Sequence, residues 1–221
     1  TPESASWKYL SFAVQTLEPT EVYEGDSGNL ELAIVPLSGH CVIEVGTQSF
    51  SLSRASVWLE LPQVLYLPPH SAFKVTAISR LEFSVGGAPA EGIYPIRLFT
   101  SSEMRSELRG GANATRQVNH ILGADLPAER LLLYEVYTPS GNWSGWPPHR
   151  HDGELESLYI EETYFYKIQP SSGWAVHRNY SPQLHGGRST RLSSSDAARG
   201  RRGLGVDARR LGGQTVWNPV W

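Results

Sequence analysis

Short apolar runs separated by turn residues fill the first hundred residues, and this pattern constrains the fold more than any other feature of the chain. Glycine, proline, serine and aspartate stand between the runs, and these residues favour turns. Phe73, Val75 and Ala77 alternate with Lys74 and Thr76, as in a strand with one buried face. Short strands at this spacing are typical of an antiparallel sandwich or barrel. The sequence therefore predicts an all-β fold, with strands at residues 9–14, 30–36, 40–45, 49–52, 57–61, 64–67, 73–78 and 81–85.

The composition excludes several other classes of protein. Charged residues make up 19% of the 221 residues, below the roughly 25% of an average soluble domain, and the chain has three lysines and one methionine. A coiled coil or a helical bundle is therefore disfavoured. No apolar run approaches the ~18 residues that a membrane-spanning helix needs, so we expect no membrane partner.

The single cysteine, Cys41, excludes a disulfide within the chain. It lies in an apolar run, and cysteine is among the most frequently buried residue types, so we expect an inert, buried thiol. The chain also shows no basic, apolar leader at its start. Both observations favour a cytoplasmic protein.

A polar stretch at residues 101–116 interrupts the β pattern and predicts either a linker or a short helix at 102–108 followed by a loop. β-prone runs resume at 130–137, 159–168 and 173–180. Two β units joined by a polar stretch indicate a duplicated architecture, although no residue-level repeat links them. We expect the N-terminal unit to cover residues 1–105 and the C-terminal unit to cover 106–182.

The tail formed by residues 183–221 has a different composition from the rest of the chain. It holds seven arginines, seven glycines and two aspartates, and it has no lysine, glutamate, isoleucine, phenylalanine or tyrosine. This composition predicts a disordered or weakly ordered segment. The net charge of −3 is therefore the sum of −8 over residues 1–182 and +5 over the tail. Because no aromatic residues are interleaved with the arginines, we expect no nucleic-acid partner.

One segment carries residues suited to metal chemistry. His149 and His151 are two residues apart, so on a strand both imidazoles point to the same side. Glu162 opens a β-prone run that could lie alongside them. Two imidazoles and a carboxylate suit Zn, Mn or Fe and leave coordination positions open for water or substrate. A solvated surface histidine pair is the simpler reading of the same spacing.

The identity of the carboxylate is open from the residues alone. Glu156 follows His151 by five residues, whereas Glu162 heads the best-formed strand and shares a face with Tyr164 and Tyr166. We prefer Glu162 because a strand holds a ligand more rigidly than a loop does. On this reading the remaining acidic residues of the segment are solvated loop charges, namely Glu154, Glu156 and Glu161.

A longer string of residues resembles a known family. Residues 132–180 resemble the second half of the 5-deoxy-glucuronate isomerase family, commonly called IolB, whose relatives are the 5-keto-4-deoxyuronate isomerases. The matching strings are far more specific than a bare His-x-His: Glu135-Val136-Tyr137-Thr138-Pro139-Ser140-Gly141-Asn142-Trp143-Ser144, Pro147-Pro148-His149-Arg150-His151-Asp152 and Glu161-Glu162-Thr163-Tyr164-Phe165-Tyr166.

The resemblance implies two cupin (jelly-roll-like) β-barrels in tandem, with a divalent metal, zinc or manganese, in the C-terminal barrel and no organic cofactor. By motif position, His149, His151 and Glu162 would be three of the metal ligands. The implied reaction is the aldose–ketose isomerisation of 5-deoxy-glucuronate to 2-deoxy-5-keto-gluconate in myo-inositol catabolism. The implied partner is therefore a small sugar acid, and a homo-oligomer is compatible with the family.

Two roles stay open under this resemblance. The base that moves the proton could be Tyr164, Tyr166 or a carboxylate that we do not assign. The substrate carboxylate would suit an arginine, and the candidates are Arg97, Arg130 and Arg178.

The end of the chain departs from the family pattern. The family has a fourth metal ligand, a histidine in a Gly-Tyr-His-Pro type of turn, and nothing after Tyr180 resembles it. Neither His177 nor His185 has that context, and the resemblance stops near Ser181-Pro182. We therefore expect an incomplete C-terminal barrel, and we hypothesise that a shift of reading frame produced the tail. Two alternative functions follow: a degenerate, non-catalytic cupin that binds a sugar acid, or another metal cupin such as a dioxygenase.

Overall fold

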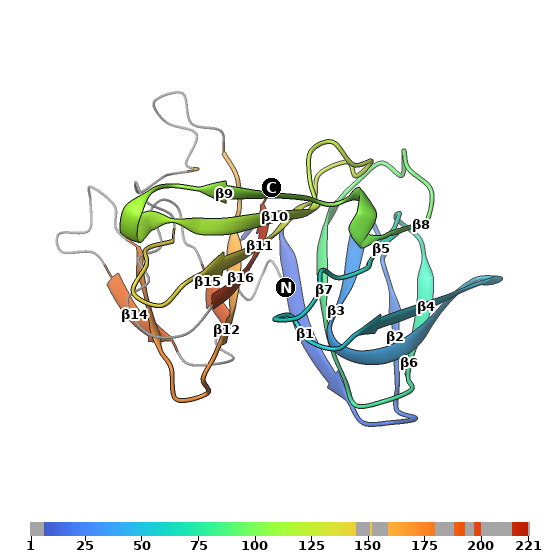
Figure 1. Ribbon diagram of the computed structural model, residues 1–221. Coiled ribbons are helices and arrows are strands. Elements are labelled where there is room, and N and C mark those ends of the chain that lie inside the picture. Colours follow the sequence, from blue (N-terminus) through green and yellow to red (C-terminus); the bar gives the residue numbers. More distant parts are fainter. Residues whose placement is uncertain are drawn as a thin grey trace. The chain divides into compact units, whose positions relative to one another are not determined.

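Strands dominate the computed structural model, which describes residues 7–144, 151 and 159–179 and the backbone of three later strands (Figure 1). The prediction of an all-β fold is confirmed. The first eight strands are β1 (Ser11–Leu17), β2 (Val22–Asp26), β3 (Leu30–Val45), β4 (Gln48–Arg54), β5 (Val64–Leu67), β6 (Ala72–Ala77), β7 (Leu81–Pro89) and β8 (Arg97–Phe99). The later strands are β9 (Arg105–Arg109), β10 (Arg116–Leu122), β11 (Leu132–Thr138), β12 (Thr163–Ile168), β13 (Ala175–Asn179), β14 (Arg188–Leu192), β15 (Ala197–Arg199) and β16 (Gln214–Val220).

The chain divides into two compact units that exchange segments. The first comprises Thr1–Met104 and Ile121–Leu132, and the second comprises Arg105–His120 and Leu133–Trp221. The sequence predicted consecutive ranges of 1–105, 106–182 and 183–221. These ranges do not include the assignment of Ile121–Leu132 to the first unit, and they stay a prediction.

A buried carboxylate holds the returning segment in the first unit. Glu31 on β3 is fully buried, and its side chain accepts hydrogen bonds from the backbone N–H groups of Glu129, Arg130 and Leu131 at 2.8, 2.6 and 2.7 Å. The hydroxyl group of Tyr66 donates a fourth, at 2.9 Å. Buried carboxylates persist when their oxygens are fully hydrogen-bonded, so this arrangement explains why residues 121–132 belong to the first unit.

The long strand β3 links the two sheets of the first unit. Its first half pairs with β5 and β7, and its second half pairs with β4 and β6. The register shifts between Pro36 and Ser38, and Gly39 then adopts a φ of +101°. A Cβ atom at Gly39 would lie 2.2 Å from the carbonyl oxygen of Arg80, so only glycine fits this bend. The two predicted strands at 30–36 and 40–45 are therefore one bent strand.

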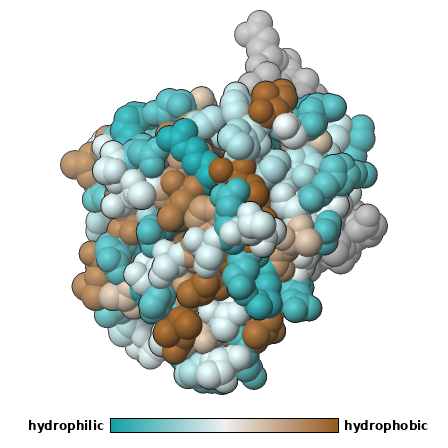
Figure 2. All heavy atoms as spheres, turned by 90° about the vertical axis from the view of Figure 1, so that its right-hand side faces the viewer, coloured by the Kyte–Doolittle hydropathy of each residue, from teal (hydrophilic) through white to brown (hydrophobic). Residues whose placement is uncertain are grey.

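The core of the first unit lies between these sheets. It is built from aliphatic and aromatic side chains that alternate along the strands, such as Ile43 on β3, Leu65 on β5 and Phe83 on β7. Cys41 belongs to this core and is 1% exposed, as predicted. In Figure 2, hydrophobic and hydrophilic residues are interspersed on the face shown.

The strand predicted at residues 57–61 is wrong. The Ser56 hydroxyl accepts a hydrogen bond from the backbone N–H of Trp58, and the N–H of Leu59 bonds to the carbonyl oxygen of Ser56, so the segment turns. The carbonyl oxygen of Glu60 is held by the guanidinium group of Arg54. Side-chain bonds to the backbone compete with strand pairing, and here they prevail over the apolar pattern.

The second unit contains a six-stranded sheet in the order β15-β12-β16-β11-β10-β9, and a separate hairpin of β13 and β14. The helix predicted at 102–108 is wrong, because a short 3-10 turn at Ser101–Glu103 is followed directly by β9. Strands β14, β15 and β16 lie in the tail, where composition predicted weak order, and β15 and β16 pair with β12. Strand pairing thus extends further along the chain than composition indicated.

Both helices in the described residues are single 3-10 turns, and neither is long enough to cross a membrane.

Candidate active site

Strand β12 carries the acidic and aromatic residues of the candidate site on one face. Tyr164 and Tyr166 alternate along the strand, and Glu162 precedes it by one residue in the same alternation. Burial increases along this row, since Glu162 is partly exposed, Tyr164 is 5% exposed and Tyr166 is fully buried. The row therefore leads from the surface into the core of the second unit, and the three residues alternate along the strand as the sequence predicted.

His177 on β13 completes the buried part of the row. Its Nδ1 lies 2.7 Å from the hydroxyl oxygen of Tyr166, and its ring lies 5.3 Å from that of Tyr164. The two tyrosine rings are stacked, with centroids 6.2 Å apart. Sequence reasoning set His177 aside because it lacked the family's histidine context. His177 lies two residues after Ala175 on β13, so both side chains point to the same, buried face. The apolar residue at position 175 was the signal in the sequence that His177 faces inward.

Both tyrosines are held in the protonated form. Burial raises the pKa of Tyr164 well above its ordinary value, and the negative charge and the hydrogen bond of Glu162 raise it further. Burial and the charge of Glu162 act on the pKa of Tyr166 in the same direction. The arrangement therefore holds two protonated phenol groups away from bulk water.

The structure describes two of the three predicted metal ligands. The carbonyl oxygen of His151 accepts a hydrogen bond of 3.1 Å from the backbone N–H of Ile160, which draws His151 toward the segment that leads into β12. Glu162 lies at the entrance of that strand, while His149 lies outside the described residues, as does Glu156. Within the described residues, no three His, Cys, Asp or Glu side chains gather closely enough to hold a metal ion.

These two residues fit a divalent metal in their donor chemistry, because an imidazole and a partly exposed carboxylate are ligands that zinc and manganese accept. The complete set of His149, His151 and Glu162 stays a prediction. Glu161, which the sequence placed among the solvated loop charges, is instead buried, with the hydroxyl group of Tyr159 3.4 Å from its carboxylate. This prediction is wrong because Glu161 lies two residues before a strand that is buried on both faces.

A second polar cluster, which the sequence analysis missed, lies on the hairpin of β9 and β10. The Nε2 atom of the buried His120 is 2.8 Å from a carboxylate oxygen of Glu107, and the guanidinium group of Arg105 lies within 3.2 Å of the same imidazole. The ring of His120 contacts that of Tyr134 edge-on at 4.9 Å. The signal in the sequence for this cluster was the alternation of charges at positions 105, 107 and 109. The sequence analysis interpreted these charges as part of a polar linker.

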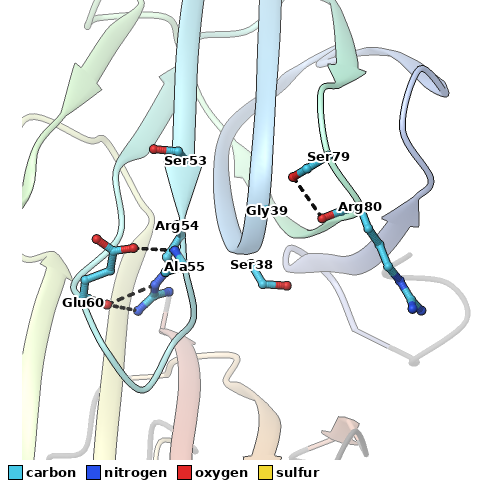
Figure 3. Close-up of a pocket in the computed structure, with 8 residues that line it drawn as sticks. All are labelled: Ser38, Gly39, Ser53, Arg54, Ala55, Glu60, Ser79 and Arg80. Carbon is cyan, nitrogen blue, oxygen red and sulfur yellow. Dashed lines mark hydrogen bonds between the residues drawn. The ribbon is translucent and has the colours of Figure 1, made fainter.

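An open hollow of about 570 Å³ occurs in the first unit, and its lining includes none of the predicted site residues. It is lined by Ser38, Gly39, Ser53, Arg54, Ala55, Glu60, Ser79 and Arg80. Figure 3 shows the guanidinium group of Arg54 turned toward the carbonyl group of Glu60, while the side chain of Arg80 points away from the other labelled residues. Because the buried cation is occupied by backbone carbonyls, we assign this hollow a structural role.

Comparison with known proteins gives a consistent result. The protein-family model described as "KduI/IolB family" matches residues 1–205. Two curated relatives named 5-deoxy-glucuronate isomerase, from Geobacillus kaustophilus (strain HTA426) and Geobacillus thermodenitrificans (strain NG80-2), are each 37% identical over 186 residues. Each match covers 82% of this chain and 67% or 68% of the relative, respectively.

Solved structures agree with this assignment. An IolB-like protein from Salmonella typhimurium LT2 has a TM-score of 0.93 at 31% identity, with 100% of this chain and 86% of that chain covered. A structure of oxalate decarboxylase from Bacillus subtilis has a TM-score of 0.64 at 11% identity, with coverages of 96% and 68%. The second likeness shows the fold alone.

Proposed function

Because this chain belongs to the KduI/IolB family, we propose that it is a 5-deoxy-glucuronate isomerase that acts in inositol catabolism. The observation that carries the proposal is the 37% identity to curated relatives of that name over 82% of the chain. A cytoplasmic setting and a small sugar acid as substrate belong to the same proposal.

The reaction is an internal redox exchange without an external oxidant. The open-chain substrate has an aldehyde at one end and a carboxylate at the other. A proton leaves the carbon next to the aldehyde, an enediol forms, and a proton returns to the former aldehyde carbon. The aldehyde becomes a primary alcohol and the neighbouring alcohol becomes a ketone, so atoms and electrons balance.

A divalent metal, zinc or manganese, would be held by His149, His151 and Glu162 in this proposal. When bound, such a metal polarises a carbonyl group and stabilises the negative charge of an enediolate. The sequence offers no fourth ligand in the family's context, so the protein would contribute three ligands.

The chain's own described residues support the chemistry in two ways. The row from Glu162 to Tyr166 becomes progressively more buried, which excludes water from the inner end of the site. Tyr164 and Tyr166 keep their protons, so they serve as hydrogen-bond donors rather than as ready bases. Of the groups considered for the base, a carboxylate is therefore favoured over the two phenols.

The direct test is to follow the purified full chain with 5-deoxy-glucuronate by proton NMR in D₂O. We expect the aldehyde signal to disappear and the ketone product to accumulate, with loss after chelation and recovery after zinc or manganese is added. Binding of the sugar acid without turnover would support the non-catalytic cupin instead. Turnover that consumes O₂ would support the dioxygenase.

The ligand assignment has its own test. His149→Ala combined with His151→Ala should abolish metal retention measured by elemental analysis. Glu162→Gln should weaken metal retention by roughly 10–100-fold, whereas the matched variant Glu156→Gln should leave it unchanged. The reverse order for the two glutamates would move the assignment to Glu156.

A further inference from the structure

The β9–β10 hairpin (green in Figure 1) carries three arginines, Arg105, Arg109 and Arg116. In the hairpin register, Arg109 lies opposite Arg116, Glu107 opposite Val118, and Arg105 opposite His120. Directly paired residues share a face, and alternate residues along a strand do as well. The six side chains therefore belong to one face of the hairpin.

Core contacts identify that face. Val118 packs in one buried cluster with Tyr164 and Tyr166, and Tyr134 packs against this cluster. His120 in turn contacts Tyr134. A continuous series of contacts thus runs from the inner row of β12 to the base of the arginine cluster.

The cluster has more positive than negative charge. Glu107 accepts bonds from both Arg105, at 3.2 Å, and Arg109, at 2.6 and 2.7 Å. Among the described residues it is the single carboxylate that contacts these two arginines. One carboxylate balances one guanidinium, so a net positive charge remains on the hairpin.

Arg116 increases this imbalance. Its guanidinium group donates to the carbonyl oxygen of Ala114 at 3.1 Å, a neutral partner. Burial lowers the pKa of Arg116, and the positive charge of Arg109 lowers it further, which shows that the two cations repel each other. An anion placed between them would relieve this repulsion.

We propose that this cluster binds the carboxylate group of the sugar-acid substrate through Arg105 and Arg109, a proposal that rests on the proposed function. The two side chains are about half exposed, at 54% and 49%, so a small ligand can reach them. A guanidinium group has five N–H donors in a planar fork that matches a carboxylate, and the bonds to Glu107 use only part of this capacity. His120, itself buried and hydrogen-bonded to Glu107, positions the pair.

The position of the cluster suits a six-carbon acid. Glu162 leads into β12, whereas Arg105 and Arg109 lie on β9, four places away in the sheet order. At 4.7–4.9 Å per place this corresponds to about 19 Å along the sheet, which the Glu162 side chain, the substrate and a long arginine side chain have to span together. The reacting aldehyde and the carboxylate stand at opposite ends of the substrate. Different strands of one sheet can therefore bind the two ends of the substrate, the aldehyde end near the metal ligands and the carboxylate end at the arginines.

The arginines proposed from the sequence are placed differently. Arg97 lies in the first unit, where its side chain pairs with Glu103 at 2.5 Å. Arg130 also lies in the first unit, in the segment held by Glu31. The side chain of Arg178 lies outside the described part of the structure.

Steady-state kinetics of Arg109→Gln test the proposal. We expect the KM for 5-deoxy-glucuronate to rise by about 10–100-fold with kcat changed less than about threefold. The reason is that the substitution removes a contact that stabilises the bound substrate and the transition state equally. The control Arg80→Gln removes an exposed arginine that pairs with Glu18 in the first unit, and it should change neither constant. Arg109→Lys keeps the charge without the fork and should give an intermediate KM.

A neutral substrate distinguishes the loss of carboxylate binding from a structural effect of the substitution. The primary amide of 5-deoxy-glucuronate lacks the anionic group, so Arg109→Gln should leave its kcat/KM unchanged. An equal loss for the acid and the amide would overturn the proposal and indicate a structural role. An unchanged KM for the acid in both Arg109→Gln and Arg105→Gln would overturn it as well.

A binding experiment separates this proposal from the proposed function. The acid whose aldehyde is reduced to an alcohol cannot isomerise but keeps the carboxylate. We expect calorimetry to show binding to the wild-type protein and to Arg80→Gln, with about 10–100-fold weaker binding to Arg109→Gln. Absence of turnover with this binding pattern intact would reject the isomerase while retaining the carboxylate site. Equal binding to all three proteins, or competition by sulfate as effective as by the acid, would reject the site.

Discussion

The hydroxyl oxygen of Tyr166 lies 2.7 Å from Nδ1 of His177, and both side chains are almost completely buried. This pair joins β12 to β13 at the inner end of the candidate active site. A hydrogen bond in such surroundings is costly to break, because the remaining polar group stays away from water.

Tyr166→Phe removes one partner of this bond without changing the shape of the ring. We expect the free energy of unfolding to fall by about 1–3 kcal/mol, measured by urea titration. The control is Tyr23→Phe, since the partly exposed Tyr23 packs through its ring against Phe73 and Phe83, and loss of its hydroxyl group should cost less than about 0.5 kcal/mol. Equal effects of the two variants would contradict a special role for the buried pair.

Glu31→Gln should destabilise the first unit strongly. The carboxylate of Glu31 accepts three backbone N–H bonds and one from Tyr66, whereas an amide would turn its own N–H₂ group toward some of these donors. We expect a loss of about 2–4 kcal/mol in the free energy of unfolding. Glu44→Gln, which removes only an exposed ion pair with Lys74, should cost less than about 1 kcal/mol. A loss for Glu31→Gln as small as this control would show that the buried carboxylate does not anchor residues 129–131.

Cys41 should resist alkylation in the folded protein. Burial raises the pKa of its thiol to about 11, so almost none of it is thiolate near neutral pH. Mass spectrometry after iodoacetamide treatment should show no modification until urea unfolds the chain. Rapid labelling of the native protein would contradict the burial of this residue in the core.

Acid should remove the contribution of the Glu107 cluster to stability. Its hydrogen bond to His120 and its contacts with Arg109 and Arg105 lower the pKa of Glu107 from its ordinary value of 4.5 to about 2. A carboxylate with a lowered pKa in the folded state stabilises the fold above its ordinary value and loses this effect as the pH falls toward the lowered one.

Urea titrations of the wild-type protein and Glu107→Gln at several pH values check this expectation. The difference in unfolding free energy should be largest above about pH 4.5 and should shrink toward pH 2. A difference that stays constant through this window would contradict the lowered pKa.

Local patterns in the sequence predicted much of the first unit. The strand expected at 64–67 matches β5, and those expected at 73–78 and 81–85 lie within one residue of the starts of β6 and β7. In these segments the residues that pack in the core alternate or cluster within a few positions, so neighbouring residues alone carry the information.

Other elements depend on partners far along the chain. β9 has no apolar face of its own, and its strand conformation comes from pairing with β10. The turn at 57–61 depends on Arg54. In the candidate site, the face that carries Glu162, Tyr164 and Tyr166 followed from alternation, whereas the contact of Tyr166 with His177 required the position of β13.

The bend of β3 at Gly39 has a consequence for how this protein can vary. One strand fixes the registers of β4, β5, β6 and β7 together. Inserting a single residue into β3 would turn the side chains beyond it to the opposite face against several neighbours at once. Residues 55–63 carry no strand pairing, so a change of length there would shift no strand register. We therefore expect insertions and deletions among homologues to spare β3 and to collect in that connection.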